Sequence, residues 1–141
     1  MSLEFSARDY ILLLLKSHNR EKINGKLYFQ KEMFLAVKEI CPDLDGELKF
    51  EPYHYGPYSI ELANLLDNME LESLINIDND CTYSITDKGV EKISSLQFSD
   101  EIIEKTQNLK TNSNNLGYKG LLRYVYFNYP DYTVKSTEKM N

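Results

Sequence analysis

A ten-residue aromatic segment with a Gly-Pro break constrains the fold of this chain more than any other feature. Its sequence is FEPYHYGPYS, and an amphipathic helical pattern follows it directly. Pro52 fixes its own φ angle and lacks an amide donor, whereas Gly56 accepts backbone angles that other residues avoid. Pro57 suits the first turn of a helix, and Ser59 is an alternative cap. The segment therefore predicts an extended strand that turns sharply into a helix.

Most of the remaining chain shows the apolar spacing of helices. A leucine-rich run follows Ser6 and Asp9, which resemble a capping start, and it predicts a buried first helix that ends near Ser17. A turn at Asn24-Gly25 separates this helix from the next one. The pattern then predicts a helix over Lys26–Ile40, a strand over Leu48–Tyr53 and a third helix from about Pro57 to Met69.

Two short apolar runs, over residues 71–77 and 81–85, flank a polar turn and predict a β-hairpin. Thr86 is placed to cap a helix that extends to Leu96. This order resembles the second half of winged-helix domains, in which the hairpin is the wing and the preceding helix occupies the recognition position. We therefore expect a mainly α, winged-helix-like α+β single domain with a small hairpin. Its core covers residues 1–96, and a C-terminal helical extension over residues 97–141 packs on that core.

Two short motifs resemble a narrower family. The sequence KLYFQKEMFL at residues 26–35 looks like the KLQKLLYF helix of the Panacea family of phage-associated, antitoxin-like domains. Residues 50–58 match that family's F-x-x-x-x-Y-G-P motif, and the resemblance covers about residues 8–75. It implies a non-enzymatic, protein-binding role of the kind associated with toxin neutralisation, proteolytic adaptors and phage-linked loci. The YVYFNYP run at residues 124–130 is not a motif of that family.

The sequence contains no recognisable constellation of catalytic residues. His18 and His54 are the only histidines, and neither has a Ser or Cys signature nearby, so hydrogen-bonded structural roles are the simpler interpretation. A Gly-rich phosphate loop, a G-x-S-x-G elbow and an H-E-x-x-H motif are all missing from the sequence. The isolated Cys41 and Cys81 match neither a disulfide framework nor zinc spacing, which indicates a reducing, cytoplasmic setting. We expect a protein that is not an enzyme and that needs no metal or cofactor.

Charge is distributed unevenly along the chain. Residues 59–105 carry three Lys/Arg against eleven Asp/Glu, whereas residues 106–141 carry five against two. An acidic surface repels nucleic-acid phosphate, so any DNA contact has to come from outside the middle part. The strongly apolar run at residues 10–15 is too short to span a bilayer, so we expect no membrane partner. The outward face of the third helix is expected to present Glu61, Asn64, Asp67 and Asn68.

Two functions from different classes remain open. The first is a protein-interaction module, with an antitoxin-like or phage- and defence-associated role. The alternative is a winged-helix DNA-binding transcriptional regulator that uses the basic side chains Arg20, Lys22, Lys26, Lys119 and Arg123. About sixteen residues separate the second and third helices, where a helix-turn-helix uses roughly three or four, and this spacing favours the interaction module. The predicted partner-binding residues are Gln30, Lys31, Tyr53, His54, Tyr55, Gly56, Pro57 and Tyr58, with the alternative that Gln30 and Lys31 belong to a solvated helix face.

The C-terminal segment is the second candidate interface. A helix there carries Tyr118, Leu121, Leu122 and Val125, and an aromatic run follows it as far as Tyr132. One interpretation is a homodimer or partner contact through residues 115–132, because exposed apolar patches often mark interfaces. The other is that this helix covers the leucine-rich first helix within one chain.

Overall fold

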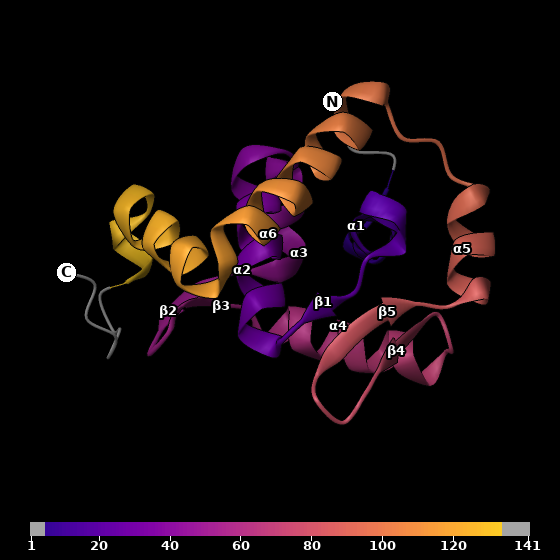
Figure 1. Ribbon diagram of the computed structural model, residues 1–141, viewed down its shortest axis with the longest axis horizontal. Coiled ribbons are helices and arrows are strands. Elements are labelled where there is room, and N and C mark those ends of the chain that lie inside the picture. Colours follow the sequence, from indigo (N-terminus) through magenta and orange to yellow (C-terminus); the bar gives the residue numbers. More distant parts are fainter. Residues whose placement is uncertain (1–4, 134–141) are drawn as a thin grey trace.

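The fold of the protein is given by a computed structural model that describes residues 5–133. Helices account for most of these residues, and the strands are short (Figure 1). The elements in chain order are α1 (Ala7–Arg20), β1 (Ile23–Asn24), α2 (Lys26–Glu39), the 3-10 turn η1 (Pro42–Leu44), α3 (Asp45–Leu48), β2 (Glu51–Tyr53), β3 (Gly56–Tyr58), α4 (Ile60–Leu71), β4 (Ile75–Ile77), β5 (Thr82–Ile85), α5 (Asp87–Ser94), α6 (Asp100–Asn128) and the 3-10 turn η2 (Pro130–Tyr132).

The sheet topology confirms the winged-helix-like α+β fold. β1, β5 and β4 form a three-stranded antiparallel sheet in that spatial order. Ile23 of β1 lies opposite Tyr83, and Ile75 of β4 lies opposite Ile85. With α1, α2 and α4 as the three helices, the β4–β5 hairpin is the wing and α4 occupies the recognition position. The segment from η1 to β3 is an insertion between the second and third helices of this scaffold.

α1 begins as the sequence predicts. The Ser6 hydroxyl accepts a hydrogen bond from the Asp9 amide, and the Asp9 carboxylate accepts one from the Ser6 amide, which completes a capping box. The end of α1 is less regular, because Ser17 is extended and the next three residues have φ angles of 56°, 56° and 58°. The helical backbone of α1 thus ends just before Ser17, near the expected position.

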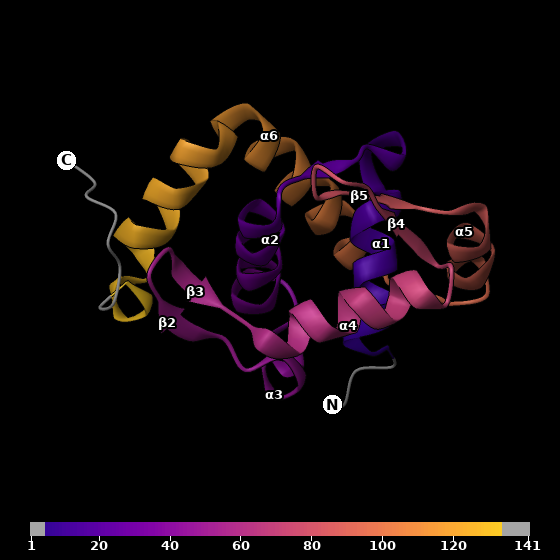
Figure 2. The same ribbon diagram turned by 90° about the horizontal axis from the view of Figure 1, so that it is seen from below.

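The core lies between α1, α2, α4 and the sheet. Residues 10–15 of α1 are all buried, and Phe29 of α2 meets Tyr83 of β5 with ring centroids 4.7 Å apart. Residues 29–37 of α2 are also all buried, which is unusual for a helix with polar residues among them. The reason is that α6 bends around α2 and covers the face that the sheet leaves open (Figure 2).

α6 consists of two arms that meet at Gly117, where φ is 71° and ψ is 177°. The first arm packs against α1. The Thr106 hydroxyl lies within hydrogen-bonding distance of the Tyr10 hydroxyl, and the Lys110 ammonium donates to the Leu14 carbonyl. The second arm lies on α2 and β3, with Leu121, Leu122 and Val125 fully buried within the chain. The interpretation that residues 115–132 cover the first helix is therefore wrong. The second arm covers α2 and β3, and the first arm of α6, whose bounds the sequence pattern did not give, covers α1.

No helix within residues 5–133 combines the length and the apolar composition needed to cross a membrane.

Candidate partner-binding site

The aromatic segment forms a β-hairpin, so the expectation that Pro57 starts a helix is wrong. Pro57 lies in β3 directly opposite Pro52 of β2, and Tyr53 lies opposite Gly56. His54 and Tyr55 form the tip of the hairpin. The physical reason is the backbone of Gly56, whose φ of 90° reverses the chain before the proline. The helix begins afterwards, with Ser59 as the cap that the sequence offered as the alternative.

The buried side chain of Gln30, on α2, fixes the end of the hairpin. Its side-chain amide donates to the Ser59 carbonyl at 2.9 Å, and its carbonyl accepts from the Ser59 amide at 2.8 Å. The Ser59 hydroxyl in turn donates to the Leu48 carbonyl and accepts from the Leu62 amide at 2.9 Å. Gln30 is 1% exposed, so its side chain supports the site from inside and the expectation of an exposed Gln30 is wrong.

Lys31 is also buried, which corrects the same expectation for its neighbour. Its ammonium lies 5.6 Å from the centroid of the Tyr118 ring, a cation–π arrangement between α2 and the second arm of α6. Its side chain also passes beneath Gly56. Periodicity along α2 could not reveal this burial, because the covering residues Gly56 and Tyr118 lie 25 and 87 positions further along the chain.

The remaining predicted site residues divide into three classes of exposure. Gly56 and Pro57 are buried. Tyr53 and Tyr58 are half-buried and meet edge to face across the hairpin, with ring centroids 5.5 Å apart. His54 and Tyr55 at the tip are exposed. The structure therefore brings all eight predicted residues to one corner of the molecule but leaves only the two tip side chains broadly accessible.

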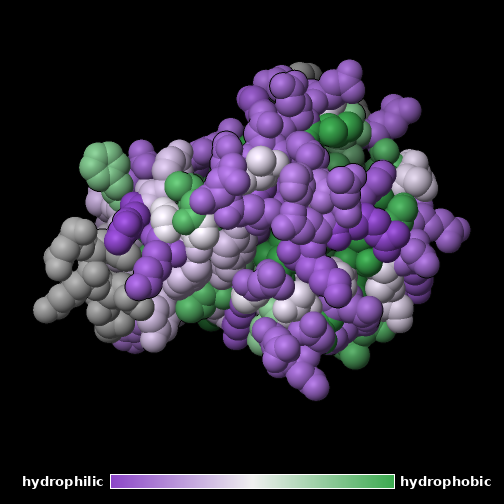
Figure 3. All heavy atoms as spheres, in the orientation of Figure 1, coloured by the Kyte–Doolittle hydropathy of each residue, from purple (hydrophilic) through white to green (hydrophobic). Residues whose placement is uncertain are grey.

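The second arm of α6 extends this corner with aromatic side chains. Tyr126 lies against Gly56, and the hydroxyls of Tyr124 and Tyr129 donate to the Glu39 carboxylate at 3.0 and 2.7 Å. Phe127 is 87% exposed. On the face of the molecule in Figure 3, hydrophobic side chains show only as small separate groups, and hydrophilic ones cover most of it. Phe127 belongs to residues 115–132, which the sequence offered as a second candidate interface, separate from the hairpin.

The end of the aromatic run is partly internal. Tyr129 and Tyr132 both pack on Phe34 of α2, with ring centroids 5.1 and 4.8 Å away. Leu121, Leu122 and Val125 are likewise used within the chain. These contacts remove most of the apolar surface that the sequence assigned to a partner. Leu116, Tyr124 and Phe127 remain as the exposed large hydrophobic side chains of that segment.

The recognition face of the winged-helix scaffold is acidic, as the sequence predicts. Glu61, Asn64, Asp67 and Asn68 of α4 are all exposed, and α4 contains no Lys or Arg. The tip of the wing is acidic too, because it carries two exposed aspartates at positions 78 and 80. Both elements that touch DNA in a winged helix therefore present the wrong charge for phosphate.

A groove of about 330 Å³ lies in the elbow of α6. Its walls are the aliphatic side chains of Leu35, Leu109, Leu116 and Leu121, and Glu39 and Lys105 lie among the polar residues that line it. Within residues 5–133, no three His, Cys, Asp or Glu side chains gather as metal ligands would.

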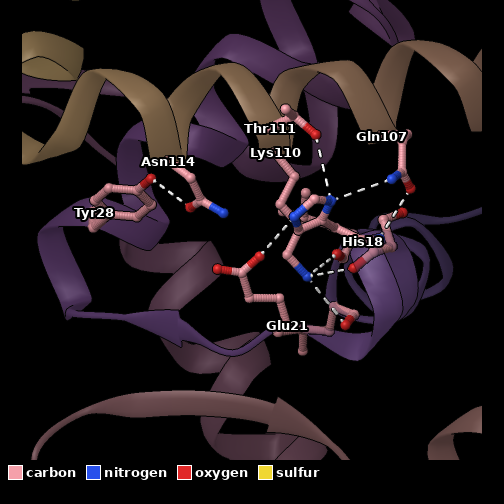
Figure 4. A network of polar contacts seen from close by, with 10 residues as sticks. His18, Glu21, Tyr28, Gln107, Lys110, Thr111 and Asn114 are labelled. Atoms are coloured by element: carbon pink, nitrogen blue, oxygen red, sulfur yellow. Dashed lines mark hydrogen bonds and ion pairs between the residues drawn. The ribbon is translucent and has the colours of Figure 1, made fainter.

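His18 belongs to a polar network at the end of α1 (Figure 4). One ring nitrogen lies 3.1 Å from the Glu21 carboxylate, and the other lies 3.3 Å from the Gln107 amide. The backbone amide of His18 also donates to Gln107 at 2.9 Å. These contacts tie the end of α1 to the first arm of α6, which is a structural role.

Comparison with known proteins adds no assignment, since no protein-family model and no curated protein matches this chain.

Proposed function

We propose that the protein is a non-enzymatic protein-interaction module, with an antitoxin-like or phage- and defence-associated role. It binds a partner protein through the hairpin tip and the neighbouring second arm of α6. The observation that supports this most is an exposed Tyr55 at the tip of a hairpin whose end is anchored by the buried Gln30 and Ser59. The free thiols of Cys41 and Cys81 fit a reducing, cytoplasmic setting.

Preorganisation is the physical argument for this surface. Tyrosine supplies a large contact area and a polar tip with few rotatable bonds, and it is enriched at binding hot spots. A partner that contacts Tyr55 does not have to order the hairpin, because Gln30, Ser59 and the packed Tyr53–Tyr58 pair already do so. Binding therefore avoids the loop-ordering cost that weakens many interfaces. Phe127 adds an apolar side chain on the adjoining helix.

A pair of neighbouring tyrosines gives the sharpest test of this proposal. Tyr55→Ala should weaken partner binding about 30-fold, as loss of a hot-spot side chain does, and should change the free energy of unfolding by less than about 0.5 kcal/mol. Tyr53→Ala should instead destabilise the fold by about 1–2 kcal/mol, because it removes one ring of the Tyr53–Tyr58 pair. Chemical denaturation and titration calorimetry measure the two effects.

The partner has first to be identified. Mass spectrometry of proteins that co-purify with the wild-type chain and are absent with Tyr55→Ala identifies candidates, and light scattering tests for a homodimer. Each candidate is then purified and titrated with both variants. A strict monomer for which no partner depends on Tyr55 or Phe127 contradicts the proposal.

The alternative function, a DNA-binding regulator, makes the opposite prediction for nucleic acid. We expect no salt-sensitive binding to random duplex DNA near physiological ionic strength, because α4 and the wing tip are acidic. A mobility-shift or anisotropy titration with sub-micromolar protein measures this. Clear binding that weakens steeply with added salt would favour the regulator. Charge reversal at Lys22 and Lys119 would then test whether these basic side chains contact the DNA.

A further inference from the structure

The first arm of α6 is held to the core by a polar stripe. Thr106, Lys110 and Ser113 are each at most 1% exposed, and their spacing places them on one face of the helix. The Thr106 hydroxyl lies 2.8 Å from the Tyr10 hydroxyl of α1. Buried hydrogen bonds therefore add to the apolar packing of Ile102 and Leu109, which lie on the same arm and contact the core. Of these three side chains Lys110 titrates, so the contact depends on its protonation state.

Lys110 closes the end of α1. Its ammonium donates to the carbonyls of Leu14, Leu15 and Ser17 at 2.9, 3.2 and 2.8 Å (Figure 4). An ammonium has three N–H donors, so these carbonyls use all of them. A positive charge at the carboxyl end of a helix is also favourable in the field of the helix dipole.

Glu32 of α2 faces the same stripe and is 0% exposed. Neither of its carboxyl oxygens has a hydrogen-bond partner within residues 5–133. The Ser113 hydroxyl lies close by without reaching hydrogen-bonding geometry, and the Lys110 donors are already used. An ionised carboxylate left in this position would be costly, whereas a protonated one is much less so.

We propose that Glu32 and Lys110 form a proton-dependent latch: protonated Glu32 allows the first arm of α6 to close on α1 and α2, and ionisation of Glu32 loosens that arm. The Ser113 hydroxyl has a single donor, so an ionised Glu32 can satisfy both of its oxygens only if Lys110 leaves a carbonyl of α1 or if water enters beneath α6. Either change weakens the contacts that hold the arm. The latch acts independently of any partner at the hairpin.

The pKa values of the two groups agree with this geometry. Burial raises the pKa of Glu32 from 4.5 to about 8, although the charge of Lys110 opposes that shift. Burial lowers the pKa of Lys110 from 10.5 to about 8, against the attraction of Glu32. The two groups titrate as a pair, because each shifts the other.

The other titratable groups around the pair come from three places. Tyr10 of α1 and Tyr28 of α2 have pKa values raised far above the range of interest by burial, so both stay neutral. Glu21, in the segment after α1, adds negative charge that raises the pKa values of both Glu32 and Lys110. His18 lies at the outer edge of the same network, beside Glu21.

The sign of the pH dependence follows from linkage. Between pH 4.5 and about 8 the closed arm binds one proton more than the open arm, so closure weakens as the pH rises. The opening constant should therefore increase about tenfold per pH unit in this window and level off near pH 8. The lowered pKa of Lys110 gives the opposite slope above pH 8, so the arm is held least tightly near that pH.

Hydrogen exchange of the amides in residues 100–116, corrected for the intrinsic rate, tests the latch. Between pH 5.5 and 7.5 the opening constant of wild type should rise about a hundredfold, and Glu32→Gln, which resembles the protonated acid, should remove that rise. Glu104→Gln, an exposed residue on the same arm, should keep it. So should His18→Asn, since asparagine tolerates the left-handed backbone there.

Three results would overturn the proposal. The first is an unchanged pH slope in Glu32→Gln. The second is an equal slope in the amides of α5, which shows that the whole chain opens. The third is a Glu32 carboxyl that titrates at its ordinary pKa in a carbon-detected NMR experiment, and this measurement does not depend on any variant folding.

Discussion

Gly89→Ala should destabilise the protein by about 3 kcal/mol and lower its melting temperature by roughly 10 °C, because the added methyl group would clash with neighbouring atoms. A Cβ at this position of α5 would lie 2.3 Å from the Leu74 carbonyl oxygen and 2.7 Å from Cγ1 of Ile85. The carbonyl is fixed, since it accepts bonds from both the amide and the hydroxyl of Thr86, at 3.1 and 2.9 Å. Thermal and chemical unfolding measure the loss.

Gly46→Ala is the matched control for this substitution. Gly46 also lies in a helix, but a Cβ there would meet no atom within 4 Å. Alanine has the higher helix propensity, so this variant should be unchanged or more stable by up to about 1 kcal/mol. A Gly89→Ala protein that melts at the wild-type temperature would mean that α5 can shift away from β4 and β5 at little cost.

Local signals predicted the elements around Gly89 well. The polar turn between two apolar runs predicted β4 and β5, and Thr86 caps α5 through its hydroxyl as expected. The capping box at Ser6 and the acidic outer face of α4 were equally accessible to sequence reasoning. All of these features depend on residues within a few positions of one another, so composition and spacing contain the information.

The features that the sequence did not predict depend on contacts between distant residues. Gln30 and Lys31 are polar and were expected at the surface, but the hairpin and the second arm of α6 cover them. Glu32 and Lys110 lie nearly 80 positions apart. The sequence around each of them, taken alone, indicates a solvated helix face. β3 was missed because the Gly-Pro pair also fits a strand-to-helix corner.

The candidate site shows the same division. The sequence located six candidate residues in the aromatic segment and two, Gln30 and Lys31, on the preceding helix. The structure shows that Gln30 anchors the segment and that Tyr55 and His54 form its accessible tip. Phe127 is part of the candidate site because the second arm of α6 lies beside the hairpin, and local sequence signals do not predict that contact. The sign of the charge on α4 was predictable, because it needs only the residues of one helix.

Gly56→Val should have the second large effect, with a loss of about 2–4 kcal/mol from two separate causes. The φ of 90° at Gly56 is strained for any side chain and worst for a β-branched one. A Cβ there would also lie 3.3 Å from the Tyr126 ring, which the two γ-methyl groups of valine would crowd further. Because the hairpin presents Tyr55, partner affinity should fall together with stability.

A double-mutant cycle separates the two causes of the Gly56→Val effect. Tyr126→Ala removes the crowding but leaves the backbone strain, so Gly56→Val should cost less in that background by about 1 kcal/mol. Gly56→Ala should fall between wild type and valine, since it keeps the strain with less bulk. Equal costs in both backgrounds would assign the whole effect to the backbone, and an unchanged free energy of unfolding in Gly56→Val would show that the hairpin closes without the left-handed turn.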